Sequence, residues 1–286
     1  MKRVLIVGSS GLLGSSLTSY LVKQYDVKTV TSSSSESDFK ADMSSQQLCM
    51  NLLNELAPDF IINLAAYTNV DGCESNIEKA YKVNTKIAEN IAEYCLENAN
   101  LFVVHLSTDH FYDECQSDEK MVRIYNSYAM TKYSAELSCI PEKTTILRTN
   151  FFGRSASLIS SGLCDSIYEL AHSGKEVNLF NDVYFSPVSI NTLCNIIGLS
   201  LKKKYPGVYN VGSKEGMSKQ NFLLEFLDRA GVEDVKYNSV CVDSMNFLVK
   251  RPKDMRMDVT LFEEKFEYIL PSLIDEIESV ANEYKK

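Results

Sequence analysis

Tyr128 and Lys132 are four residues apart in the segment Tyr128-Ala129-Met130-Thr131-Lys132. On a helix, this spacing places the phenol and the ammonium one turn apart on the same face. The pKa of a free tyrosine is about 10, and a nearby cation that stabilises the phenolate would lower it and permit proton exchange near neutral pH. Only Tyr128 among the sixteen tyrosines has a lysine four residues later, but one such pair is expected by chance, so the pair is a candidate for proton transfer because of its context. The alternative is a pair on a helix surface.

Thr108 lies upstream of this pair in the segment Leu106-Ser107-Thr108-Asp109, where an apolar run ends. If that run is a strand of an open α/β sheet, Thr108 stands at its carboxyl end, and ligands of such sheets bind outside those ends. The Thr108 hydroxyl could then donate a hydrogen bond to a substrate carbonyl. An ordinary polar residue at a strand end is the other interpretation.

A glycine-rich turn follows the first apolar run, in Gly8-Ser9-Ser10-Gly11-Leu12-Leu13-Gly14. Glycine permits a tight turn and the close approach of a pyrophosphate, and the N-terminus of the next helix supplies N–H donors and a positive dipole end. The spacing G-x-x-G-x-x-G is shifted from the commoner G-x-G-x-x-G, but its strand–turn–helix setting favours a dinucleotide site over a purely structural turn. The residues expected to contact the cofactor here are Gly8, Ser10, Gly11, Leu12, Leu13 and Gly14.

The end of the second predicted strand bears on the choice between NADPH and NADH. Specificity for NAD usually requires an acidic residue there, whereas this chain has five residues from Thr31 to Ser35 with small hydroxyls and reaches Glu36 late. Hydroxyls such as that of Ser32 can bond a 2′-phosphate without repelling it, so we expect NADPH to be preferred, with NADH as the alternative. Asp42, which precedes Met43, could accept from the adenine amino group or stand at the start of the following helix.

Alternating strands and helices in the first half of the chain position these groups. Short continuous apolar runs between amphipathic stretches are typical of a parallel sheet covered on both faces, so we predict a Rossmann-type doubly wound α/β fold. The predicted strands are Val4–Val7, Val27–Thr31, Phe60–Asn63, Leu101–Leu106 and Thr144–Leu147. The predicted helices are Leu12–Gln24, Ser44–Leu56, Ile77–Asn98 and Tyr125–Cys139.

The second half of the chain is less regular. We assign residues 1–150 to an NAD(P)-binding domain and residues 151–286 mainly to a smaller substrate-binding lobe, interleaved with the end of the sheet. Its predicted helices are Leu158–Ser173, Ser218–Gly231 and Leu273–Tyr284, and its predicted short strands are Val177–Phe180 and Val208–Val211.

Composition excludes several classes of function. A net charge of −9 argues against non-specific nucleic-acid binding, which depends on neutralising phosphates. The eight cysteines form no C-x-x-C pair and the three histidines are scattered, so we expect reduced thiols and no metal site. No apolar run is long enough for a signal peptide or a membrane span, so a cytoplasmic protein without a membrane partner is expected. A homodimer remains open.

Together, these motifs resemble the extended short-chain dehydrogenase/reductases, and most closely the dTDP-4-dehydrorhamnose reductase family. The most family-specific match is the run Ala65-Ala66-Tyr67-Thr68-Asn69-Val70-Asp71. The other matching segments are Val7–Gly14, Pro58–Leu64, Val83-Asn84, Leu106–Asp109, Tyr128–Lys132, Leu147-Arg148-Thr149, Arg251-Pro252 and Arg256-Met257-Asp258.

The resemblance implies roles for particular residues. Thr108, Tyr128 and Lys132 would form the catalytic triad, Asn84 would support the proton relay, and Lys132 would also hold the nicotinamide ribose. Leu64, Ala65, Ala66 and Tyr67 would line the cofactor. Candidate substrate contacts are Val70, Asp109, His110, Asn150, Phe151 and Arg256. Basic or polar candidates to meet a substrate diphosphate are Arg148, Lys175, Asn181, Arg251 and Arg256, although solvated surface polarity is the commoner role for each.

The chain also departs from the family pattern. His110-Phe111-Tyr112 stands where the family usually has Tyr-Val-Phe, and Asn150-Phe151-Phe152 stands where it usually has a Trp. These departures fall at positions expected to contact the substrate, so they affect the expected identity of the sugar more than the expected class of reaction.

We therefore expect an NAD(P)H-dependent reductase that acts on the 4-keto group of a nucleotide-linked deoxysugar. Two alternatives stay open. A non-catalytic NAD(P)-binding regulatory subunit is disfavoured because the Tyr128/Lys132 pair is retained. An epimerase or dehydratase of the same superfamily is disfavoured because dehydratases typically place an acidic pair after the Ser/Thr, and here Asp109 is followed by His110.

Overall fold

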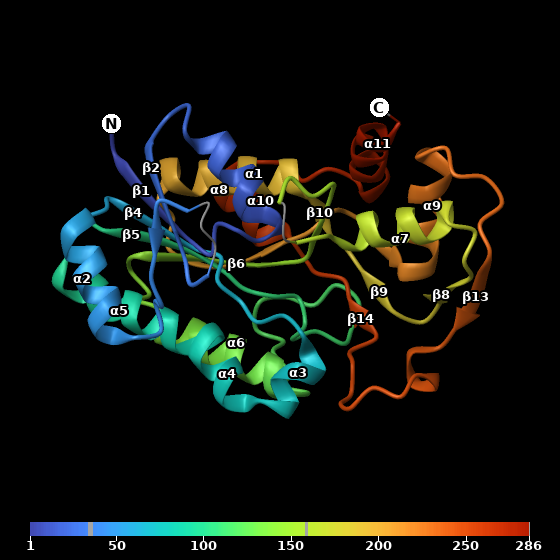
Figure 1. Cartoon of the computed structure of the whole chain (residues 1–286), viewed down its shortest axis with the longest axis horizontal. Helices are drawn as coiled ribbons and strands as arrows, with labels where there is room; N and C mark the ends of the chain where they lie inside the picture. Colours follow the sequence, from blue (N-terminus) through green and yellow to red (C-terminus); the bar gives the residue numbers. More distant parts are fainter. Residues whose placement is uncertain (34–36, 158–159, 286) are drawn as a thin grey trace.

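A seven-stranded parallel sheet forms the centre of the larger part of the molecule (Figure 1). The structure is a computed structural model, and it describes residues 1–33, 37–157 and 160–285. The strand order is β11-β6-β5-β4-β1-β2-β3, and every neighbouring pair is parallel. The strands are β1 (Arg3–Val7), β2 (Asp26–Thr31), β3 (Phe39–Lys40), β4 (Phe60–Asn63), β5 (Phe102–Leu106), β6 (Thr144–Thr149) and β11 (Gly207–Val211). The predicted doubly wound α/β fold is confirmed.

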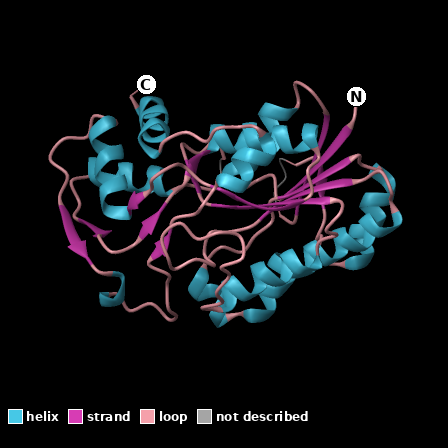
Figure 2. Cartoon of the chain, turned by 180° about the vertical axis from the view of Figure 1, so that it is seen from behind, coloured by secondary structure: helices cyan, strands magenta, loops and turns pink. Residues whose placement is uncertain are grey.

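Helices cover both faces of this sheet, which is why its central strands consist of buried apolar residues (Figure 2). One face carries α1 (Leu12–Leu21), α8 (Ile190–Lys203) and α10 (Thr260–Phe266). The other face carries α2 (Gln46–Leu56), α5 (Ile87–Glu97) and α6 (Ser127–Ser138). Alternate residues of one strand enter different cores: Val4 and Ile6 of β1 pack with the first group, and Leu5 and Val7 with the second.

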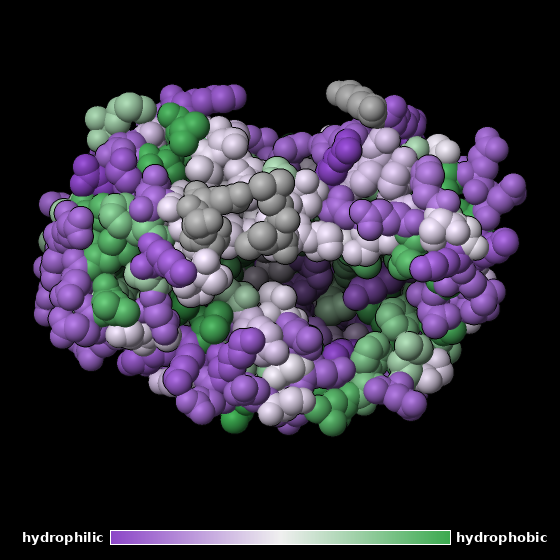
Figure 3. Space-filling model, viewed as in Figure 1, coloured by the Kyte–Doolittle hydropathy of each residue, from purple (hydrophilic) through white to green (hydrophobic). Residues whose placement is uncertain are grey.

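The smaller part of the chain has a hydrophobic core of its own, with Phe222 and Phe226 at zero exposure. Its helices are α7 (Leu163–His172), α9 (Lys219–Arg229) and α11 (Leu273–Tyr284). Its strands are β8 (Val177–Phe180), β9 (Tyr184–Phe185), β12 (Met217–Ser218), β13 (Tyr237–Val240) and β14 (Asp254–Met255). A two-stranded parallel pair, β7 (Phe151–Phe152) with β10 (Val188–Ser189), joins it to the larger part. Figure 3 shows this face of the molecule hollowed near its centre, between the two parts.

The predicted helix at 77–98 is interrupted. The structure has α4 (Ile77–Tyr81), then a π-helical turn at Lys82–Lys86, and then α5. Such turns are rare and frequently occur at functional sites. Among the described residues, the sequence analysis also missed α3 (Val70–Ser75), α8 and α10, and the predicted start of a helix at Leu158 lies outside them.

Two features are absent from residues 1–33, 37–157 and 160–285. No helix there is long and apolar enough to cross a membrane. No group of three or more His, Cys, Asp or Glu side chains is arranged there to hold a metal ion.

Candidate active site

A cavity of about 730 Å³ opens beside the glycine loop and the carboxyl ends of β1, β2 and β4. Its lining brings together segments that are far apart in the sequence, as a dinucleotide site at the switch point of a doubly wound sheet requires. The predicted cofactor residues that line it are Gly8, Ser10, Gly11, Ser32, Asp42, Met43, Leu64, Ala65 and Ala66. Sequence reasoning missed other lining residues, including Asn76, Lys79 and Lys82 from the α4 region.

The glycines of the loop have different roles. Gly8 has φ +86°, and a Cβ there would lie 2.9 Å from the backbone nitrogen of Ala65, so the loop and the end of β4 approach too closely for a side chain. A Cβ on Gly14 would lie 2.4 Å from the carbonyl oxygen of Ser9, which makes Gly14 a packing residue. Gly11 differs because a Cβ there would meet only the Gly8 carbonyl oxygen, at 3.6 Å. Gly11 therefore leaves open the space that faces the cavity.

Leu12, Leu13 and Gly14 are not in the cavity lining found among the described residues. The Leu13 side chain is buried in the core and Leu12 packs against it. Gly11 is the N-cap of α1, and the Gly14 N–H donates to the Gly11 carbonyl oxygen at 3.1 Å, so among the described residues the N–H groups of Leu12 and Leu13 are the helix donors left for an anion.

A second cavity, of about 290 Å³, lies where the larger and smaller parts of the chain meet. Thr108 and Tyr128 line it together, which places the two predicted catalytic hydroxyls on one space. The predicted substrate residues Val70, Asp109, His110 and Asn150 also line it. Ala66 lines the first cavity and Thr68 lines the second, so only Tyr67 separates the two linings along this loop.

Lys132 follows Tyr128 by one turn of α6, as predicted, and is almost fully buried. Its Nζ donates a 2.7 Å hydrogen bond to the carbonyl oxygen of Leu106, at the end of β5. Burial lowers the pKa of Lys132 to about 8, with Glu136 opposing the shift. Lys132 thus ties α6 to the strand end that precedes Thr108.

The expected lowering of the Tyr128 pKa is wrong for this structure. Burial raises the pKa of Tyr128 to about 12, and a hydrogen-bonding contribution from Thr108 opposes this only in part. The physical reason is that desolvation of the phenolate dominates while the Lys132 ammonium is engaged by Leu106. Tyr128 is therefore held as a neutral phenol, the form that can donate a proton.

Asn84 lies in the π-helical turn and holds the backbone of the loop before the second cavity. Its side-chain oxygen accepts from the Tyr67 N–H at 2.6 Å, and its Nδ2 donates to the Tyr67 carbonyl oxygen at 3.2 Å and to Thr131 Oγ1 at 3.0 Å. Asn84 is 1% exposed and lines neither cavity. Its contacts make it a positioning residue between Tyr67 and α6, so its predicted role in a proton relay stays a prediction.

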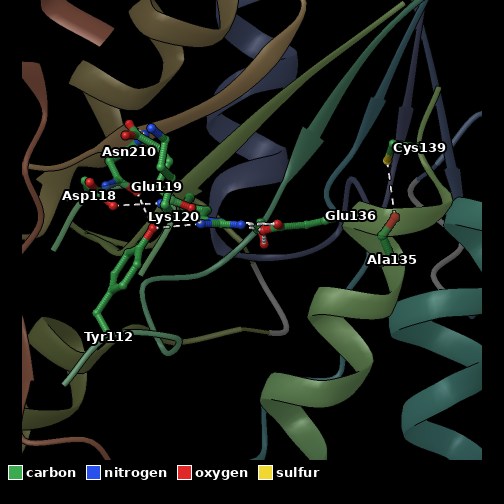
Figure 4. A network of polar contacts seen from close by, with 10 residues as sticks. Tyr112, Asp118, Glu119, Lys120, Ala135, Glu136, Cys139 and Asn210 are labelled. Atoms are coloured by element: carbon green, nitrogen blue, oxygen red, sulfur yellow. Dashed lines mark hydrogen bonds and ion pairs between the residues drawn. The ribbon is translucent and has the colours of Figure 1, made fainter. Parts of the chain in front are cut away.

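A buried ion pair joins α6 to the sheet behind the site. The guanidinium of Arg148, on β6, donates to the Glu136 carboxylate from two nitrogens, and both side chains are 3% exposed. Arg148 also donates to Tyr112 Oη, which donates to Asn210 on β11 (Figure 4). The prediction that Arg148 meets a substrate diphosphate is therefore wrong, because its donors are engaged in the core.

Asp109 and His110 follow Thr108 and are polar groups with shifted pKa values. Burial raises the pKa of Asp109 to about 6, opposed by a hydrogen bond from Asn150 Nδ2 at 3.0 Å. Burial lowers the pKa of His110 to about 3, so its imidazole is neutral. The Asn126 amide nitrogen lies 3.0 Å from His110 Nε2, which must accept because an amide nitrogen only donates. The His110 proton is then on Nδ1, and its ring packs edge-on against Tyr128.

Several other candidates lie outside the second cavity. Phe151 pairs with Val188 in the strand pair that joins the two parts. Arg256 is paired with Asp254 and lies over the Tyr184 ring. Asn181 donates to Ser239, and Lys175 is exposed. Only Arg251, of the predicted basic candidates, lines the cavity.

Comparison with known proteins agrees with this geometry. The family model for the RmlD substrate binding domain matches residues 1–286. The chain belongs to this family. It is 26% identical to a dTDP-4-dehydrorhamnose reductase of Aggregatibacter actinomycetemcomitans, over 93% of this chain and 94% of that protein. It is 25% identical to a probable low-salt glycan biosynthesis reductase of Haloferax volcanii, over 95% of both chains.

A solved structure shares the fold. The dTDP-4-dehydrorhamnose reductase of Bacillus anthracis, crystallised in complex with NADP, superposes with a TM-score of 0.88 at 24% identity, covering 99% of this chain and 100% of that one. As a member of the RmlD family, the chain is an NAD(P)-dependent oxidoreductase of the extended short-chain dehydrogenase/reductase class. The predicted family and enzyme class are confirmed.

Proposed function

We propose that this RmlD-family enzyme reduces the 4-keto group of a nucleotide-linked deoxysugar with NADPH, in surface polysaccharide or deoxysugar biosynthesis. The observation that carries the proposal is that Thr108 and Tyr128 line the second cavity, next to the first cavity, which is built around the glycine loop. The curated dTDP-4-dehydrorhamnose reductase that matches most of the chain supports the substrate class.

The residues divide the chemistry between them. A reduced nicotinamide, when bound, supplies the hydride to the ketone carbon. Thr108 orients the carbonyl through its hydroxyl, and Tyr128 donates the proton that the developing alkoxide needs. Tyr128 is protonated throughout the neutral range because its pKa is raised. Lys132 holds the nicotinamide ribose and fixes α6 to the end of β5.

The preference for NADPH rests on the rim of the first cavity. Ser32 lines it directly after β2, together with Thr31 and Ser44; Lys82 also lines it but is paired with Glu78. Hydroxyls suit a 2′-phosphate, whereas an acidic residue at the strand end would repel it.

A panel of ketones tests the proposal. NADPH oxidation is followed with 4-keto-6-deoxy nucleotide sugars and with their nucleotide-free counterparts, and the reaction is expected only with the nucleotide sugars. Binding energy from the remote nucleotide can position the keto carbon, so the truncated substrates should lose kcat as well as affinity. Comparable kcat/KM with and without the nucleotide would contradict the proposed substrate class.

A further inference from the structure

Lys219 is a cation in the lining of the second cavity. It is the first residue of α9, directly after the N-cap Ser218, and it lines the same cavity as Thr108 and Tyr128. Among the described residues, its ammonium forms no ion pair within 4 Å and no side-chain hydrogen bond. It lies 5.7 Å from the centre of the Phe185 ring, and the Asp109 carboxylate attracts it from beyond ion-pair distance. Burial lowers the pKa of Lys219, which reflects the cost of keeping this charge from water.

Arg251 brings a second cation to the same space. Its Nη2 pairs with Asp71 at 2.8 Å, but its Nη1 is buried without a hydrogen-bond partner among the described residues. The repulsion between the two cations also contributes to the lowered pKa of Lys219, so they face a common region. An unsatisfied guanidinium nitrogen beside a ligand cavity indicates a missing acceptor.

Two carboxylates and one histidine lie close to this pair of cations. Asp109 lines the cavity and is ionised above its raised pKa of about 6, so at pH 7 its carboxylate attracts Lys219. His110 is neutral. The Asp71 carboxylate is already paired with Arg251. The cavity therefore holds two cations, and among the described residues the Nη1 donor of Arg251 still lacks an acceptor.

We infer that Lys219 is a specificity-determining residue that, with Arg251, binds an anionic oxygen group of the substrate. This inference rests on the proposed function and deepens it by assigning a subsite within the substrate cavity. Phosphate and carboxylate oxygens share the required chemistry, since both accept charge-assisted hydrogen bonds from an ammonium and a guanidinium. The group is either the diphosphate of the nucleotide or a carboxylate carried by the sugar.

Direct binding distinguishes the two sources without depending on turnover. UDP, dTDP and D-glucuronate are titrated calorimetrically into the NADP⁺-loaded protein, with thymidine and glucose as uncharged counterparts. Lys219→Met should weaken the binding of one anionic class by roughly 10- to 100-fold, the usual contribution of a hydrogen bond to a charged group. A loss confined to UDP and dTDP identifies the diphosphate, and a loss confined to glucuronate identifies a carboxylate. Lys219→Arg, which keeps the charge, should retain most of the affinity.

Two controls separate this effect from a general loss of charge or fold. Lys202→Met removes an exposed lysine of α8 and should leave anion binding unchanged. NADPH affinity should be equal in Lys219→Met and wild type, because Lys219 lines the second cavity and not the first. The inference is overturned if Lys219→Met binds every anionic probe like wild type, or if the wild type binds no anion more tightly than its uncharged counterpart. Anion binding through Lys219 in a protein that reduces no 4-keto sugar would overturn only the proposed function.

Discussion

The Ser107 hydroxyl donates a 2.5 Å hydrogen bond to the carboxylate of Glu136, one turn beyond Lys132 on α6. Ser107 directly precedes Thr108, so this bond and the Lys132–Leu106 bond both hold α6 against the end of β5. These contacts fix the positions of Thr108 and Tyr128, whose hydroxyls line one cavity. Glu136 is thus shared between the positioning of Ser107 and the neutralisation of Arg148.

Glu136→Gln should lower the free energy of unfolding by about 3–5 kcal/mol, because it leaves the Arg148 guanidinium buried without a counter-charge. Urea denaturation at neutral pH measures this loss. Ser107→Ala removes only a neutral donor and should cost about 1 kcal/mol. The exposed pair Lys82–Glu78 is the matched control, and Glu78→Gln should cost less than 1 kcal/mol, roughly the range of surface pairs. Equal losses of unfolding free energy in Glu136→Gln and Glu78→Gln would mean that the buried Arg148–Glu136 pair is no more important for stability than an exposed pair.

Gly11→Val should fold normally and lose cofactor binding. A Cβ on Gly11 meets nothing closer than 3.6 Å and the backbone there is extended, so the substitution is tolerated by the protein itself. The added side chain would occupy the space beside the loop where a pyrophosphate must approach. Fluorescence titration with NADPH and NADH tests this, and circular dichroism checks the fold. Wild-type affinity in Gly11→Val would remove the glycine loop from the cofactor site.

Tyr128→Phe should lower kcat by about 10²–10⁴, the usual contribution of a positioned general acid, while NADPH affinity stays nearly unchanged. Only the proton donor is lost, because the ring that packs against His110 is kept. Lys132→Met should reduce both kcat and NADPH affinity, since Lys132 serves α6 and the ribose together. Steady-state kinetics beside direct titration separates the two variants. A Tyr128→Phe enzyme as active as wild type would eliminate the proposed proton donor.

The pH dependence of the reduction should reflect Lys132. Its pKa is lowered to about 8, so the ammonium is present below that pH and is lost above it. Tyr128 stays protonated over the same range because its pKa is raised. We therefore expect kcat to fall as the pH rises through about 8. A kcat that remains level well above pH 8 would mean that the charge of Lys132 is not needed for turnover.

Local patterns predicted the parts of the site that depend on neighbours in the chain. The glycine loop, the end of β5 at Thr108 and the spacing of Tyr128 and Lys132 each lie within a few residues, so strand and helix signals were enough to place them. The helix at Ser218–Gly231 was also found, because Ser218 is an N-cap and Gly231 has φ +80°.

Contacts between distant segments could not be predicted in the same way. Arg148 and Glu136 carry no local sign that they neutralise each other, and Arg148 was mistaken for a phosphate ligand. Lys219 was overlooked because nothing near it in sequence connects the start of α9 with Thr108. The failure to predict α8 has a different cause. Its N-cap Ser189 and its recurring apolar residues are local signals of a helix, and they were overlooked.

Asp109→Asn should make the protein more stable at pH 7 than the wild type, at the expense of its activity. Asp109 is 3% exposed, and its pKa rises from 3.8 to about 6 on folding. The folded state therefore favours the protonated carboxyl, so the contribution of Asp109 to stability is fully present below about pH 4 and is lost as the pH rises through about 6. At pH 7 the carboxylate is ionised in both states and costs more in the folded one, by about 3 kcal/mol for a shift of this size.

Asparagine removes that cost and can still accept the hydrogen bond from Asn150. The stabilisation should thus be largest near pH 7 and nearly absent near pH 4, which melting temperatures measured at the two pH values would show. The ionised Asp109 carboxylate attracts Lys219, which lines the same second cavity. A charge that destabilises the folded state is thus kept beside Thr108. An equal change in melting temperature at both pH values would mean that the substitution acts through packing and that the charge of Asp109 carries no such cost.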